Sequence, residues 1–142
     1  MSVVKEITAI AEMEALFPVL CQMYPNLSEK EYQSVLPARV AQGYRMIAVF
    51  DEVGNPQAVA GFWIGYRFYC KKFLQIDNMV ADKGRTVKGC GKLLIDWVKK
   101  EAKAQGCERI LLDTFVENYD AHRLFMREGF IARGYHYNFL LD

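Results

Sequence analysis

The most informative stretch of the sequence is RTVKGCGKLL, residues 85–94. It follows a segment of strand character, 73–81, and leads into a segment whose apolar residues recur at helical spacing, 92–105. The start of a helix presents backbone N–H groups that have no partner in the helix, together with a partial positive charge. Glycine allows such a backbone to approach a ligand closely. The stretch therefore predicts a turn that binds a phosphate group.

Three cationic side chains, Arg85, Lys88 and Lys92, flank the two glycines and favour a diphosphate as the ligand. An ordinary tight turn with solvated lysines is the alternative interpretation. The spacing excludes two other nucleotide-binding motifs. A Walker P-loop requires lysine where this chain has Cys90, and a Rossmann fingerprint requires a third glycine where it has Leu94.

Length and composition indicate how many domains the chain forms and which partners it attracts. A chain of 142 residues, 52% of them hydrophobic, predicts one domain over residues 1–142 with one sizeable core. The net charge of +1 gives no general attraction to nucleic acid or to an anionic membrane, so neither is expected as a partner.

The chain also shows no sign of secretion or of a metal site. Its first residues lack the basic and then apolar pattern of a secretory signal, and no apolar run approaches the roughly 20 residues that span a bilayer. We therefore expect a cytoplasmic protein. The four cysteines are widely spaced without a CxxC pair, which argues against a zinc site and gives no support to a disulfide framework.

Periodicity predicts a mixed α/β domain around the glycine turn. Strands are expected at 3–8, 44–50, 57–69, 73–81 and 110–115, with a final pair within 130–141, and helices at 9–24, 28–43, 92–105 and 118–128. The run of strands predicts an antiparallel core, to which the later strand–helix–strand unit adds a parallel pair. Alternation in 73–81 places Leu74, Ile76, Asn78 and Val80 on one face, and Gln75, Asp77, Met79 and Ala81 on the other.

Two segments carry a resemblance to the GNAT N-acetyltransferases. Gly89 and Gly91 match the signature Arg/Gln-x-x-Gly-x-Gly/Ala, which opens a helix directly after a strand, although Thr86 stands where arginine or glutamine is expected. Residues 118–130 are similar to the family's segment Asn-x-x-Ala-x-x-Leu-Tyr-x-x-x-Gly-Phe. Phe125 occupies the place of the tyrosine that often protonates the leaving thiolate in that family.

The resemblance implies a GNAT-like fold and acetyl-CoA as co-substrate. The implied sheet is mostly antiparallel, has six or seven strands, is splayed in the middle and is flanked by about four helices. Asn118 would contact the pantetheine arm across the gap, while Met79 and Val80 would pair with it as an added strand. A backbone N–H there would polarise the thioester carbonyl. The diphosphate would contact Arg85, Val87, Lys88, Gly89, Cys90, Gly91 and Lys92.

Acetyl transfer to a primary amine by direct attack in a ternary complex requires a neutral amine close to the carbonyl. Asp77, two residues before Met79, is the candidate base, and a solvated strand residue is its alternative interpretation. Asp113 and Glu31 are weaker candidates, since capping of a helix explains Glu31.

The general acid is left open by Phe125. The alternatives for the general acid are Tyr119, Tyr135, Tyr137 and water. We count Tyr119 with Asp77 among the catalytic candidates. Cys90, at a helix start beside cations, has conditions that favour a thiolate and a covalent acyl-cysteine route, but the sequence supplies no base for it.

The acceptor is a small-molecule or protein amine, and the sequence does not choose between them. A second function stays open: a catalytically weak acyl-CoA-binding module that acts through a protein partner. Phe125 and Thr86, which depart from the family pattern, are the residues that keep it open. Members of the family are often dimers, so a homodimer is plausible on the resemblance alone.

Overall fold

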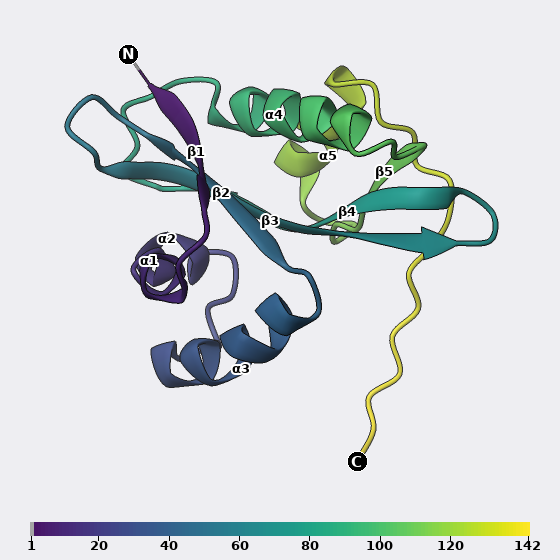
Figure 1. The fold of residues 1–142 in the computed structure, drawn as a ribbon, viewed down its shortest axis with the longest axis horizontal. Helices are drawn as coiled ribbons and strands as arrows, with labels where there is room; N and C mark the ends of the chain where they lie inside the picture. Colours follow the sequence, from purple (N-terminus) through teal and green to yellow (C-terminus); the bar gives the residue numbers. More distant parts are fainter. Residues whose placement is uncertain (1) are drawn as a thin grey trace. The chain divides into compact units, whose positions relative to one another are not determined.

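The computed structural model describes residues 2–142, which form one five-stranded sheet and five helices (Figure 1). Contacts within the chain divide it into two compact units, Met1–Leu112 and Asp113–Asp142, and each is described by itself. Across residues 2–142, no helix combines the length and the apolar character needed to cross a membrane.

The sheet lies entirely in the first unit and its strands follow chain order. Its members are β1 (Val3–Ile7), β2 (Arg45–Phe50), β3 (Pro56–Arg67), β4 (Lys71–Ala81) and β5 (Arg109–Leu112). The first four pair antiparallel, and β5 pairs parallel to β4. The predicted antiparallel core with one added parallel pair is therefore confirmed.

Helices cover both faces of this sheet (Figure 1). One face carries α1 (Ile10–Glu14), α2 (Phe17–Leu20) and α3 (Glu29–Ala41), and the other carries α4 (Cys90–Ala104). Met13, Leu20 and Leu36 are buried against the first face, and Leu94 and Val98 against the second. Two apolar cores on opposite sides of β2, β3 and β4 therefore stabilise these central strands.

Local signals set the helix boundaries. Pro18, in the first turn of α2, separates α1 from α2, so the predicted helix over 9–24 is broken where the proline stands. The capping box at the start of α3 is present: Glu31 N–H donates to Ser28 Oγ at 3.1 Å, and Ser28 N–H donates to Glu31 Oε1 at 3.0 Å.

A β-bulge interrupts β4 at Asp77. Gly61 of β3 lies opposite Asn78, but the next residue, Phe62, lies opposite Ile76. Asp77 is thus the extra residue of β4 and has no partner in β3.

The bulge changes which side chains share a face. Leu74 and Ile76 pack on the α4 side, as alternation predicts, but Met79 packs there with them, while Val80 packs on the α1–α3 side. The predicted alternation through 73–81 is therefore wrong beyond Ile76, because one extra residue reverses the facing of every residue after it.

The second unit contains α5 (Tyr119–Arg127) and no strand. Asn118 caps α5 by accepting the Ala121 N–H at 3.3 Å, and the helix ends at Arg127, within one residue of the predicted range 118–128. The predicted pair of strands within 130–141 is wrong: the structure has no helix or strand after Arg127, and the sheet has five strands rather than six or seven. A strand exists only in a ladder with a partner, and residues 130–141 belong to none of the described ladders.

The bulge region generates a stability prediction at Gly61. The Tyr44 hydroxyl occupies the place where a Cβ on Gly61 would lie, and it exchanges hydrogen bonds with the buried Asn78 side chain at 3.0 and 3.1 Å. Gly61→Ala should displace Tyr44 and lower the free energy of unfolding by about 1–3 kcal/mol, measured by urea denaturation. Gly134→Ala, whose added Cβ meets nothing within 4 Å, is the control. Equal urea midpoints for the two variants would contradict the prediction.

Candidate functional site

The glycine turn opens α4 as the sequence predicts. Gly89 is the N-cap residue, with φ +72° and ψ 25°, in the left-handed region that favours glycine. A Cβ at Gly89 would meet nothing within 4 Å, so the space beside it is open. The first intrahelical hydrogen bond runs from Leu93 N–H to Gly89 C=O, 3.0 Å. The amides of Cys90 and Gly91 precede it and have no acceptor within the helix, the arrangement that suits an anion.

A buried glutamine on β3 holds the loop before this turn. The Gln57 Oε1 atom accepts the Thr86 N–H at 2.8 Å and the Val87 N–H at 3.1 Å. The amide of Val87 is therefore already hydrogen-bonded within the protein and is not available to a diphosphate. Sequence reasoning missed Gln57, and its one signal was a polar residue at the head of an otherwise apolar strand.

The start of the same loop is held from the end of α2. Gln22 Nε2 donates to Asp82 Oδ1 at 2.6 Å, and Gln22 Oε1 accepts the Lys83 N–H at 2.9 Å. Asp82 in turn accepts the Gly84 N–H through Oδ2 at 2.9 Å. Two glutamines, each distant in sequence, thus hold the path of the chain from β4 to α4.

The cations expected around the turn lie on its exposed side. Arg85 Nη1 donates to the backbone oxygen of Asp82 at 3.1 Å, and Lys92 forms an i,i+4 ion pair with Asp96 at 3.2 Å. Lys88 is also exposed. Their positive charge adds to that of the helix start, although Asp96 offsets part of the contribution of Lys92.

A depression of about 400 Å³ borders the loop on a different side. It is lined in part by Asp51, Glu52, Thr86 and Val87. Carboxylates in its wall disfavour an anion, so this depression does not suit a diphosphate. The open space beside Gly89 does.

Cys90 does not meet the condition for a nucleophile. Its side chain is buried, and the thiol donates to the Val87 backbone oxygen at 3.3 Å. Burial raises the pKa of the Cys90 thiol above its ordinary value, and this outweighs the opposite effect of Arg85. The expectation that the helix start favours a thiolate here is therefore wrong, because the sulfur points into the core.

The sheet opens beside the turn. β5 pairs with β4 only from Phe73 to Ile76, and residues 77–81 of β4 continue past its end. On that side, Met79 and Val80 have no partner among the described strands. An edge of this kind accepts an extended chain by backbone hydrogen bonds.

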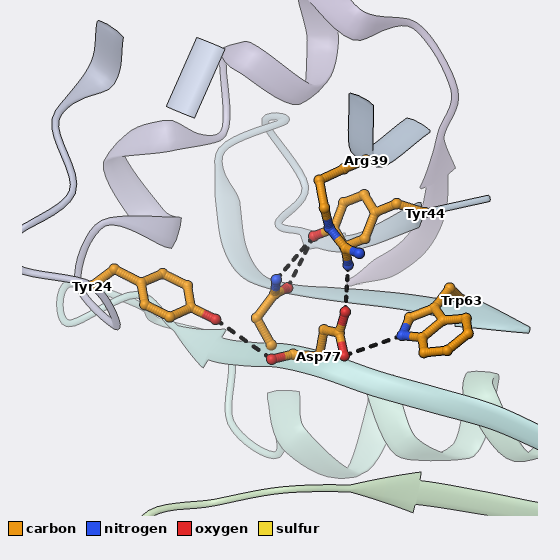
Figure 2. Close-up of polar contacts among 6 residues, drawn as sticks. Tyr24, Arg39, Tyr44, Trp63 and Asp77 are labelled. Carbon is orange, nitrogen blue, oxygen red and sulfur yellow. Dashed lines mark hydrogen bonds and ion pairs between the residues drawn. The ribbon is translucent and has the colours of Figure 1, made fainter. Parts of the chain in front are cut away.

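Asp77 stands at the start of this open edge and is held by side chains from three other segments (Figure 2). Arg39 of α3 forms an ion pair with the Asp77 carboxylate, and Trp63 Nε1 donates to its Oδ1 at 3.2 Å. Tyr24 donates its hydroxyl to the Asp77 backbone oxygen at 3.4 Å. About 30% of the Asp77 side chain stays exposed. A freely solvated strand residue, the alternative interpretation, is not what the structure contains.

The contacts around Asp77 hold its carboxyl group in one orientation. A carboxylate has about four lone-pair sites, so two donors leave capacity to accept a proton. Burial raises the pKa of the Tyr24 hydroxyl, which therefore stays protonated at neutral pH. The sequence offered no signal for Arg39 or Trp63, since 38 and 14 residues separate them from Asp77.

The other candidate residues have local partners of their own. Glu31 closes the capping box of α3, and the hydrogen bond from the Ser28 backbone lowers its carboxyl pKa. In the second unit, Asp113 pairs with His136 Nδ1 at 3.3 Å, Asn118 caps α5, and Tyr119 is the first residue of α5. The roles of Asn118 and Tyr119 toward the cofactor stay predictions.

Comparisons with known proteins agree with this geometry. The model of the acetyltransferase (GNAT) family matches residues 11–130. The N-acetyltransferase YhdJ of Bacillus subtilis (strain 168), whose own activity is uncharacterised, is 24% identical over 133 residues, which cover 92% of this chain and 93% of YhdJ.

Solved structures share the fold at low sequence identity. The aminoglycoside antibiotic 6'-N-acetyltransferase AAC(6')-Ih from Acinetobacter baumannii superposes with a TM-score of 0.82 at 13% identity, over 100% of this chain and 99% of its own. The aminoglycoside N-acetyltransferase AAC(6')-Iy, solved in complex with CoA, gives 0.80 at 15% identity, over 99% and 95%.

The family match covers far more than half of the chain and includes the glycine turn and the whole of β4. The mixed, mostly antiparallel sheet and the turn at Gly89 are those that the resemblance implied. This chain accordingly belongs to the acetyltransferase (GNAT) family and is an acyltransferase whose co-substrate is acetyl-CoA.

Proposed function

We propose that the protein transfers the acetyl group of acetyl-CoA to a primary amine by direct attack in a ternary complex. One observation carries the proposal: the bulge places Asp77 where the pairing of β5 with β4 ends, beside the edge that suits the thioester arm. A base next to the reacting carbonyl is the main requirement of this reaction.

The cofactor is assigned to the turn and the open edge. The diphosphate lies at the amides of Gly89, Cys90 and Gly91, with the cations of Arg85, Lys88 and Lys92 around it. Val87 contributes through its side chain, because its amide is bonded to Gln57 and its backbone oxygen accepts the Cys90 thiol. The pantetheine arm pairs along Met79 and Val80, where a backbone N–H polarises the thioester carbonyl, and Asn118 contacts the arm.

In the proposed step, Asp77 accepts a proton from the ammonium form of the acceptor, directly or through water, and leaves a neutral amine. The amine nitrogen forms a bond to the carbonyl carbon and gives its second proton to water, and the bond from carbon to sulfur then breaks. The leaving CoA thiolate takes a proton from Tyr119 or from water. The buried thiol of Cys90 takes no part.

The acceptor is a small-molecule or protein amine. Two structural neighbours are aminoglycoside N-acetyltransferases, which supports an amine as the acceptor class without selecting one compound. A catalytically weak acyl-CoA-binding module, the alternative, gains no support from a carboxylate held as Asp77 is. A cytoplasmic location and a homodimer remain part of the proposal.

Release of free CoA thiol tests the proposed function. The protein, acetyl-CoA and a panel of primary amines should give thiol release that depends on the amine. Acetyl-CoA should also raise the melting temperature, whereas ATP and NAD should not, because a ligand that binds only the native state stabilises it. Saturable acetyl-CoA binding without turnover on any amine would instead support the binding module.

The two ends of α4 allow a matched test of the turn. Gly89 and Gly106 have φ +72° and +75°, and an added Cβ at either meets nothing within 4 Å. Gly89→Ala and Gly106→Ala should each destabilise the protein by about 1–2 kcal/mol through backbone strain. Only Gly89→Ala should raise the KM for acetyl-CoA, because its methyl group occupies the side on which the diphosphate binds. Equal KM values for the two variants would remove the turn from the site.

Asp77→Asn tests the base. Turnover should fall by roughly 100-fold, and most at low pH, where the amine is mostly protonated, while the affinity for acetyl-CoA holds. Steady-state kinetics from about pH 6 to about pH 9 measure this, because an alkyl amine such as that of lysine, with a pKa of about 10.4, is mostly protonated there. Asp113→Asn should keep wild-type turnover. Unchanged kinetics in Asp77→Asn would exclude this carboxylate from the mechanism.

A further inference from the structure

We propose that Gln57 is a positioning residue for acetyl-CoA, and that its buried carboxamide fixes the loop leading into Gly89 before the cofactor binds. This inference rests on the proposed function, since it assigns the diphosphate to the turn at Gly89–Gly91. Gln57 itself touches neither the cofactor nor the acceptor in this account.

The first support is the burial of Gln57. Only 5% of its surface is exposed, and Ala58, Val59 and Ala60, which follow it in β3, are completely buried. A polar amide in such surroundings is costly unless it is hydrogen-bonded. Each polar atom of the Gln57 side chain has a partner, so the cost is offset here by specific contacts.

The second support is the choice of those partners. Gln57 Oε1 accepts the backbone N–H groups of Thr86 and Val87, and the Gln57 backbone oxygen accepts the Asp82 N–H at 2.8 Å. One residue of β3 thus holds both the beginning and the end of the connection between β4 and α4. Nε2 contacts the Asn55 oxygen at 3.4 Å, which ties the same residue to the β2–β3 turn.

The contacts end next to the cofactor site. Val87 lies two residues before Gly89, and the chain between them makes no regular structure. Without the oxygen of Gln57, two loop amides would lose their acceptor, and the loop would be free to move away to reach solvent. A loop that is already fixed loses less conformational freedom when the ligand binds. Gln57 therefore contributes to affinity for the diphosphate part of acetyl-CoA.

A comparison of two acetyl donors distinguishes a positioning role of Gln57 from a purely structural one. Acetyl-CoA carries the diphosphate, whereas acetyl-pantetheine carries the same thioester and arm without it. A residue that positions the turn should affect only acetyl-CoA. A residue that merely supports the sheet should affect both donors or neither.

The test compares Gln57→Met with Gln75→Met by calorimetric dissociation constants. Gln75 lies on the neighbouring strand β4, is 6% exposed and contacts Arg67 rather than the loop. The two variants therefore carry the same substitution at equally buried positions. Gln57→Met should weaken acetyl-CoA binding by roughly tenfold and leave acetyl-pantetheine binding within about twofold. Gln75→Met should change neither. Wild-type acetyl-CoA affinity in Gln57→Met, or equal weakening for both donors, would overturn the proposal.

Hydrogen exchange of the wild-type protein keeps the proposal testable if Gln57→Met does not fold. The amides of Thr86 and Val87 should already be protected without ligand, and those of Cys90 and Gly91 should gain protection only with acetyl-CoA. Rapid exchange at Thr86 and Val87 in the ligand-free protein would overturn it. Failure of the wild-type protein to bind acetyl-CoA would instead count against the proposed function, so the two failures are distinguishable.

Discussion

One extra residue in β4 determines the arrangement of the site. Because Asp77 has no partner in β3, the strand bulges and the facing of its side chains reverses after Ile76. Asp77 reaches Arg39 and Trp63 on the α3 side, at the same level at which β5 stops pairing with β4. A positioned carboxylate and an open backbone edge therefore lie at the same level of β4.

The glycine turn depends on a second constraint, the fixed position of α4. The helix is anchored by Leu94 and Val98, which are completely buried against the sheet, so its start cannot shift without disturbing the core. The left-handed conformation of Gly89 then directs the chain into the helix, and Gln57 holds the residues before it. The backbone groups that we assign to the diphosphate are thus held by contacts within the protein.

Features that depend on residues close in sequence could be predicted, whereas those that depend on distant segments could not. The capping box at Ser28 and the glycine turn each depend on neighbouring residues, so spacing alone predicts them. The bulge at Asp77 depends on the register of β3, and the partners of Asp77 come from distant segments. The prediction of strands within 130–141 was wrong because it also depended on distant residues. Apolar alternation indicates that a strand is possible, but the strand forms only where another segment pairs with it.

We propose that backbone amides at the start of α4 bind the diphosphate of acetyl-CoA. A crystal structure of the protein with CoA tests this assignment. The diphosphate should lie within hydrogen-bond distance of the Cys90 and Gly91 amides, with the pantetheine arm along Met79 and Val80. A diphosphate bound elsewhere, with the turn at Gly89 empty, would contradict it.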